Sequence, residues 1–185
     1  MVWCDAINDW FHRLSGIPGA DARVGNHPHR IEAESMELHG YIPVEVTPWE
    51  DASGGKAVEC AAPAQSCTAK FRFAGKPGRY EIDIQYFDQA NGVSKYRAFV
   101  GQRLVDEWLA NASLPTTKPD GDSSIRRVIR QVVLRNGDEL RIEGFPEGEE
   151  LAPLDYVELH PEPWPESAAS TIRRHSSCHA DDPFP

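Results

Sequence analysis

Apolar and polar residues alternate with a period of two through most of the chain, between residues 30 and 160. In 78–87, for example, Tyr80, Ile82 and Ile84 alternate with charged or amide side chains. Because successive side chains of a β-strand point to opposite faces, this pattern predicts strands with one buried face. The predicted strands, about nine in number, cover 30–37, 56–60, 68–73, 78–87, 94–100, 103–108, 125–134, 139–144 and 154–160.

Several of these strands are separated by dipeptides that accept the positive φ of tight turns: Asn91-Gly92, Asp120-Gly121 and Asn136-Gly137. No helical period occurs between the strands. Many short strands joined by turns are typical of a β-sandwich or barrel, so residues 30–160 are predicted to form one all-β domain.

The segments on either side of the β domain differ from it. In residues 3–15 the apolar side chains recur at spacings of three and four, which predicts an amphipathic helix that ends before Gly16 and Pro18. We therefore predict a helical unit in 1–18, a linker in 19–29, the β domain in 30–160 and a disordered tail in 161–185. The tail is rich in Pro and Ser and has no period.

The charge and length of the chain exclude some classes of function. The 185 residues suffice for one domain, and the net charge of −10 with a pI near 5.1 would repel a phosphate backbone, so nucleic acid is not an expected partner. No apolar run approaches the ~20 residues of a membrane span, so no membrane partner is expected. The first residues lack the pattern of a secretory signal.

Two of the four cysteines, Cys60 and Cys67, are separated by only six residues. If one ends a strand and the other begins the next, their Cα atoms can approach to the ~5.5 Å of a disulfide. Two buried free thiols are the alternative. An oxidised pair would favour an extracellular or periplasmic location.

Two glutamates, Glu32 and Glu34, lie at i and i+2 in a predicted strand and would share one face. Two carboxylates side by side are unfavourable unless a positive charge lies between them. A Ca²⁺ ion, which takes six to eight oxygen ligands, is one answer, and Asp155 in an apolar strand could add a further carboxylate. Neutralisation by a neighbouring Arg or Lys is the other.

The β region is similar to carbohydrate-binding modules of families 6 and 35. The resemblance rests on Ile31-Glu-Ala-Glu34, Leu38-His-Gly-Tyr41, Ala52-Ser-Gly-Gly-Lys-Ala-Val58, Gly78-Arg-Tyr-Glu-Ile-Asp-Ile-Gln-Tyr86, Phe99-Val-Gly101 and Leu154-Asp-Tyr-Val-Glu158. It implies a jelly-roll β-sandwich. It also implies a structural calcium held by Glu32, Glu34, Asp155 and a backbone carbonyl near Ala52 or Ser53.

The same resemblance implies a sugar-binding cleft made of loops at one edge of the sandwich, in which aromatic rings stack on a pyranose. Ser123–Arg127 and Ala152-Pro153 stand where many relatives have a cleft Trp and an Asn. The remaining candidates are Tyr41, Trp49, Tyr86, Asn91, Trp108, Lys118, Asp120, Arg126 and Arg127. Core packing is the alternative for the aromatic residues, and a solvated strand face is the alternative for the two arginines.

The N-terminal segment resembles the C-terminal helix of family 67 glycoside hydrolases, the xylan α-glucuronidases. The resemblance rests on Trp3, Asp5-Ala6, Phe11 and Ser15-x-x-Pro18. It implies an upstream catalytic domain as a partner, and the catalytic carboxylates of that family match nothing in this chain. A non-catalytic module that binds plant cell-wall glycan, xylan or uronic-acid-bearing sugars, is thus the leading hypothesis. A structural accessory domain without a sugar site is the alternative, and a free-standing hydrolase is a third.

Three short motifs remain. His27-Pro-His29 and His175-x-x-Cys178-His179 contain metal-ligating residues but lack partners at the spacing of a zinc site. Asn111-Ala-Ser113 fits the acceptor sequence for N-glycosylation, which matters only in a eukaryotic secretory pathway.

Overall fold

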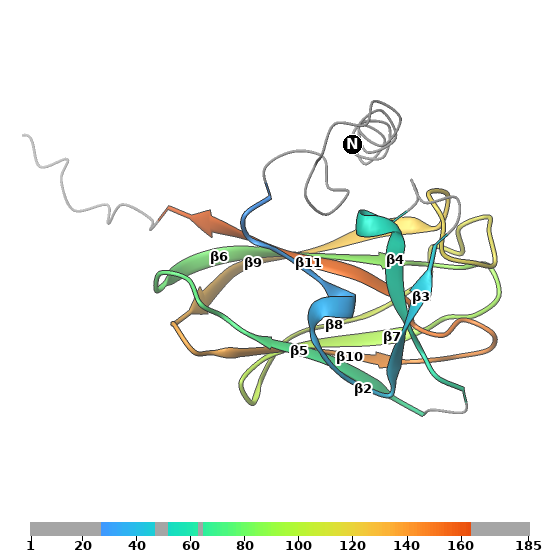
Figure 1. The fold of residues 1–185 in the computed structure, drawn as a ribbon, viewed down its shortest axis with the longest axis horizontal. Helices are drawn as coiled ribbons and strands as arrows, with labels where there is room; N and C mark the ends of the chain where they lie inside the picture. Colours follow the sequence, from blue (N-terminus) through green and yellow to red (C-terminus); the bar gives the residue numbers. More distant parts are fainter. Residues whose placement is uncertain (1–26, 47–51, 63–64, 164–185) are drawn as a thin grey trace, which may run out of the picture.

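The computed structural model describes residues 27–46, 52–62 and 65–163. The predicted N-terminal helix, Trp49, Cys4, Cys178 and the tail beyond residue 163 lie outside these ranges. The tail was predicted to begin at residue 161, which was wrong, because strand pairing continues to Glu162. Within them, eleven strands and two short 3₁₀ helices form two packed antiparallel sheets (Figure 1). The strands are β1 (Arg30–Glu32), β2 (Glu37–His39), β3 (Tyr41–Glu45), β4 (Lys56–Cys60), β5 (Cys67–Arg72), β6 (Gly78–Phe87), β7 (Lys95–Val100), β8 (Arg103–Leu109), β9 (Ser124–Leu134), β10 (Glu139–Phe145) and β11 (Leu154–Glu162), and the 3₁₀ helices are η2 (Ala33–Ser35) and η4 (Ser53–Gly55). The predicted all-β sandwich is confirmed.

The six-stranded sheet has the order β3-β4-β11-β6-β9, and β1 pairs with β11 beside this path. The five-stranded sheet has the order β2-β5-β10-β7-β8. Strands that are neighbours in a sheet are mostly distant in sequence, so the chain crosses repeatedly between the two sheets. This connectivity places β8 and β9 at the edges of their sheets on one side of the sandwich, where the two strands contact each other.

The core lies between the two sheets and explains the alternation in the sequence. On β6, the apolar residues Tyr80, Ile82, Ile84 and Tyr86 point inward and are almost completely buried. Of the intervening polar residues on the outer face, Asp83 and Gln85 are buried and Glu81 is half-buried. Strand β6 is central in its sheet and pairs with β11 on one side and with β9 on the other.

The prediction of one strand over 30–37 was wrong. The chain turns through η2 after β1, and β2 begins only at Glu37. The turn is closed locally, because the Ser35 hydroxyl donates to the Glu32 carbonyl at 2.7 Å and the Met36 N–H donates to Ala33 at 3.1 Å. Strand β3, with Pro43 inside it, was not predicted, and it lies at a sheet edge, where a missing N–H is tolerated.

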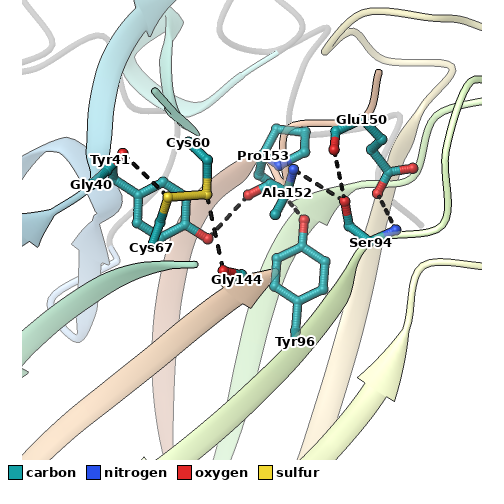
Figure 2. The surroundings of a disulfide bond; sticks show 10 residues. All are labelled: Gly40, Tyr41, Cys60, Cys67, Ser94, Tyr96, Gly144, Glu150, Ala152 and Pro153. Carbon is teal, nitrogen blue, oxygen red and sulfur yellow. Dashed lines mark hydrogen bonds between the residues drawn. A yellow bond between two sulfur atoms is a disulfide. The ribbon is translucent and has the colours of Figure 1, made fainter. Parts of the chain in front are cut away.

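Cys60 and Cys67 form a disulfide, with their Cα atoms 5.7 Å apart (Figure 2). Cys60 ends β4 of the six-stranded sheet and Cys67 begins β5 of the five-stranded sheet, so the bond joins the two sheets at one corner. Both residues are buried. The described residues contain no helix that is long and apolar enough to cross a membrane.

Tyr41 crosses the sandwich next to this disulfide, and its hydroxyl donates to the Ala152 carbonyl at 3.1 Å (Figure 2). The ring passes over Gly144 of β10, where a Cβ atom would stand 2.1 Å from the Tyr41 hydroxyl and 2.9 Å from the Ala152 Cβ. A side chain at position 144 is therefore excluded by packing between the sheets.

We expect Gly144→Ala to lower the free energy of unfolding by about 2 kcal/mol or more, because it overpacks the core next to Tyr41. Gly78→Ala is the matched control, since Gly78 is also a strand residue but its added Cβ would meet only Tyr80 at 3.6 Å. Urea denaturation of both variants checks this. Equal stability of the two variants would contradict the packing described.

Candidate functional site

An acid cluster lies where β1, η2 and η4 meet the start of β11. Ser53 joins two of its carboxylates: the Ser53 hydroxyl donates to Glu32 Oε1 at 2.9 Å, and the Ser53 N–H donates to both oxygens of Asp155, at 3.2 and 3.3 Å. Glu32, Ser53 and Asp155 are all buried, and Glu34 is half-buried. The structure thus links two of the three predicted carboxylate ligands, Glu32 and Asp155, through Ser53, the residue near which a backbone-carbonyl ligand was predicted.

The electrostatics of the cluster centre on Asp155. Burial raises the pKa of this carboxyl well above its usual range, and the nearby charges of Glu32 and Glu34 raise it further. The Ser53 N–H and the Arg30 guanidinium act in the opposite direction. A buried carboxylate beside two others needs either a proton or an additional positive charge.

The charge of Arg30 lowers the pKa of Asp155, but most of the Arg30 hydrogen bonds go elsewhere. Its Nε and one terminal nitrogen donate to Glu158 Oε2 at 3.2 and 2.9 Å, and the other terminal nitrogen reaches the Ser53 hydroxyl at 3.4 Å. His27 also contacts Glu158, with 2.8 Å between Nδ1 and Oε1. Although burial raises the pKa of Glu158, these two partners lower it below its ordinary value. Arg30 therefore divides its hydrogen bonds between Glu158, Ser53 and His27, and only its charge acts on Asp155.

The relative positions of Glu32 and Glu34 differ from the prediction. They were expected side by side on one face of a strand, but Glu32 ends β1 and Glu34 lies in the 3₁₀ helix that follows. The η2 turn brings both glutamates toward Asp155, since their charges affect the Asp155 pKa.

In the described ranges, no group of three or more His, Cys, Asp or Glu side chains is arranged so that it could hold a metal ion. The oxygen donors suit Ca²⁺, and holding it would require these side chains to turn.

A second candidate site is the loop end, which we define as loops 88–94 and 110–123 beyond β6 and β8. Asp88 joins the two loops, because its carboxylate accepts hydrogen bonds from the N–H groups of Ala112 at 2.9 Å and Ser113 at 2.8 Å. Asp88 is 1% exposed. This buried acid fixes the path of loop 110–123 across the end of the sandwich.

Glu150 holds loop 88–94 from the other side. Its carboxylate accepts hydrogen bonds from the N–H groups of Gln89 at 3.1 Å and Ser94 at 3.3 Å, and the Ser94 hydroxyl donates to its carbonyl at 3.1 Å (Figure 2). Glu150 is fully buried, and burial raises its pKa. The loop end is therefore anchored by buried carboxylates on both sides.

Asn91 and Lys118 lie on the surface of the loop end. The Asn91 amide donates to the Thr117 carbonyl at 3.5 Å, while its Oδ1 is buried and accepts no hydrogen bond from the described residues. Lys118 is exposed. Asp120, in contrast, is buried and stabilises its own turn, because its Oδ1 accepts from the Thr116 hydroxyl and from the Ser123 N–H at 2.8 and 3.0 Å. Of the three predicted polar residues here, Lys118 is exposed, Asn91 is half-buried and Asp120 is buried in its own turn.

The predicted aromatic residues that the structure describes belong to the core. Tyr86, Tyr96 and Trp108 form one cluster below the loop end, in which the Tyr96 and Trp108 rings stack at 5.3 Å. Tyr41 and Tyr86 are 4% exposed and Trp108 is 6% exposed, so none of these rings offers a face to a sugar as it stands. Burial raises the pKa of Tyr86 to about 12.

Arg126 and Arg127 lie on opposite faces of β9 and have different partners. Arg126, on the outer face, donates to Asp83 at 3.2 Å, to Gln85 at 3.3 Å and to the Tyr156 hydroxyl at 2.8 Å. Arg127 makes a bidentate pair with Asp106, at 2.7 and 3.1 Å, 5.7 Å above the Trp108 ring. Both guanidinium groups are thus already engaged within the protein.

Asp88 and Glu150 were not predicted from the sequence. Asp88 follows a strand directly, and Glu150 sits in the run Glu147-Gly-Glu-Glu150, which has the composition of a solvated loop. Their partners are 24 and 61 residues away, so no local pattern could have identified them.

Comparisons with known proteins were made at the level of sequence and of structure. No family model matches the chain. It is 43% identical over 167 residues, 88% of its length, to a probable α-glucuronidase A of Aspergillus clavatus, and 40% identical over the same length to α-glucuronidase A of Emericella nidulans. The chain is homologous to a segment of α-glucuronidases. It spans 20% of the length of these relatives.

Solved structures identify the fold. The chain is similar to a family 35 carbohydrate-binding module from Clostridium thermocellum, with a TM-score of 0.53, 13% identity, and coverage of 72% of this chain and 98% of that one. It is also similar to the Podospora anserina GH26-CBM35 β-(1,4)-mannanase, with a TM-score of 0.52, 22% identity, and coverage of 74% and 28%. The sandwich has the fold of family 35 modules, and the predicted resemblance is confirmed.

We expect Asp88→Asn to destabilise the chain by about 1–3 kcal/mol, because an amide at this buried position turns a donor toward one of the two N–H groups that the carboxylate accepts from. Hydrogen exchange at Ala112 and Ser113 should accelerate. Asp122→Asn, in the same loop but exposed, is the matched control and should leave both rates unchanged. Unchanged protection in Asp88→Asn would show that the carboxylate does not anchor the loop.

Proposed function

We propose that the chain is a non-catalytic carbohydrate-binding module that attaches an α-glucuronidase to plant cell-wall glycan. The observation that carries this proposal is the fold, which matches a family 35 carbohydrate-binding module over 98% of that module's length. The α-glucuronidase relatives, of which the chain corresponds to a fifth, supply the context. A sugar-binding module attached to an α-glucuronidase is expected to bind a glycan that carries uronic-acid side groups, so we propose xylan of this kind as the ligand.

The sugar site in this proposal is the loop end, with Asn91 and Lys118 as contact residues. Asn91 Oδ1 is buried and accepts no hydrogen bond from the described residues, so the Asn91 amide would have to turn outward to accept one from a sugar hydroxyl. The exposed ammonium of Lys118 suits the carboxylate of a uronic acid. The buried anchors Asp88 and Glu150 would keep this surface in place before the ligand arrives.

Calcium is a separate part of the proposal. The ligands would be Glu32, Glu34 and Asp155, with a backbone carbonyl near Ser53. Burial and the neighbouring charges of Glu32 and Glu34 all oppose the charge on Asp155, and a cation bound among these oxygens would offset them. The ion would supply structural charge balance at the joint of β1 and β11 and no chemistry on the ligand.

We further propose an extracellular or periplasmic location and contact with an upstream catalytic domain. A disulfide such as Cys60–Cys67 forms and persists in oxidising compartments. The partner domain would be the remainder of an α-glucuronidase, because the relatives are about five times as long as the matching segment.

A second candidate function is a structural accessory domain that has no sugar site. It is favoured by the internal use of predicted cleft residues: Tyr41 and Tyr86 pack in the core, and Arg126 and Asp120 are hydrogen-bonded within the chain. A calcium-dependent increase in stability without binding of any glycan would support this function over the first.

Isothermal titration calorimetry with glucuronoxylan oligosaccharides, glucuronic acid and unsubstituted xylo-oligosaccharides tests the sugar proposal. We expect Lys118→Ala to weaken binding of the uronic-acid ligands about fivefold, the range of one exposed ion pair. Binding of neutral oligosaccharides should change little. Lys76→Ala is the matched control, because Lys76 is exposed in the turn before β6, at the opposite end of that strand from the loop end. Absence of heat with every glycan would refute the sugar site.

Thermal unfolding with and without EDTA tests the calcium proposal. Calcium at a hundredfold excess over its Kd should stabilise the chain by about 2.7 kcal/mol. Asp155→Asn and Glu34→Gln should lose this response, because each removes one anionic ligand. Glu45→Gln, an exposed residue of β3, should keep it. No effect of calcium on the unmodified chain would refute the calcium proposal.

A further inference from the structure

The loop after β8 contains the sequence Asn111-Ala112-Ser113. Asparagine followed by any residue except proline and then by Ser or Thr is the acceptor sequence for N-linked glycosylation. The chain has five asparagines, and Asn111 is the one with Ser or Thr two positions later. If this motif is used, its asparagine must be able to carry a bulky glycan in the folded protein.

The backbone on both sides of Asn111 is fixed. The Ala110 N–H donates to the Ser94 carbonyl at 2.8 Å, and Ala110 is 0% exposed. On the other side, the N–H groups of Ala112 and Ser113 donate to the buried Asp88 carboxylate. Asn111 therefore stands at the point where the chain leaves the core, and its neighbours hold its position.

The Asn111 side chain itself is directed outward. Asn111, Ala112 and Ser113 are all exposed, in contrast to the fully buried Ala110. The Asn111 side chain makes no hydrogen bond to another residue in the described part of the chain. A substituent on its amide nitrogen would displace no packed side chain and break no internal hydrogen bond.

Two independent observations indicate the compartment in which such a modification takes place. The Cys60–Cys67 disulfide fits the oxidising secretory pathway. Relatives of the chain that are 40–43% identical to it come from Aspergillus species and Emericella nidulans, which are fungi and so possess a eukaryotic secretory pathway.

We propose that Asn111 is an N-glycosylation site that carries an oligosaccharide on Nδ2. In the reaction, Nδ2 forms a bond to the anomeric carbon of an oligosaccharide donor linked to a lipid pyrophosphate. The bond between that carbon and the pyrophosphate oxygen breaks, the lipid pyrophosphate leaves with the electron pair, and the amide releases one proton. The proposal does not depend on the sugar site, because the glycan is covalent and uses neither Asn91 nor Lys118.

Translation of the 185-residue chain behind a cleavable secretory signal, in the presence of endoplasmic-reticulum microsomes, tests this. We expect one glycan-sized increase in mass that peptide N-glycosidase F removes, with conversion of Asn111 to Asp in the tryptic peptide. Asn111→Gln and Ser113→Ala should abolish the shift. Asn136→Gln, an exposed turn asparagine outside any acceptor sequence, is the matched control and should retain it.

Removal of the signal shows that the chain has entered the microsomes. If the Asn111 peptide of such a chain is unmodified, the proposal is overturned. A mass shift that persists in Asn111→Gln would overturn it equally. The microsome assay reads out modification and not folding, so a variant that folds poorly still gives an answer. The chain without substitutions can also be secreted from a yeast and examined by peptide mass spectrometry. This measures the fraction of Asn111 that carries a glycan in the folded protein, which we expect to exceed half.

Discussion

Strand β11 pairs with β1, β4 and β6, and all its side chains from Leu154 to Leu159 are buried. This double burial takes Asp155 and Glu158 out of water together with their apolar neighbours. Arg30 and His27 are hydrogen-bonded to the carboxylate of Glu158. The carboxylate of Asp155 accepts a hydrogen bond from the Ser53 N–H, and the charges of Glu32 and Glu34 act on it as well. The need to neutralise Asp155 therefore links the central pairing of the sheet to the proposed calcium ion.

The residues just before β11 connect the same strand to the loop end. The carbonyls of Ala152 and Pro153 accept hydrogen bonds from the hydroxyls of Tyr41 and Tyr96, which fixes two core rings (Figure 2). Glu150, two residues earlier, holds loop 88–94. A single segment thus places the core, the acid cluster and the candidate sugar surface relative to one another, so a rigid scaffold supports a surface made of loops.

The sequence was sufficient for the long strands, because burial of one face imposes a period of two on segments such as 78–87. It was insufficient around Glu32, where a serine side chain closes a 3₁₀ turn that a two-residue period cannot reveal. It also left the roles of Tyr41 and Tyr86 open, since alternation alone does not distinguish the core face from a ligand face. The anchors Asp88 and Glu150 depend on contacts between distant segments, which no local pattern contains.

A sugar surface at the loop end is the central claim of this account. Nuclear magnetic resonance of the ¹⁵N-labelled, calcium-loaded chain, titrated with glucuronoxylan oligosaccharides, tests binding and location in one measurement. The account predicts saturable shifts of backbone amides in 88–94 and 110–123, with Asn91 and Lys118 among them. Unchanged spectra, or shifts confined to other parts of the sandwich, would contradict it.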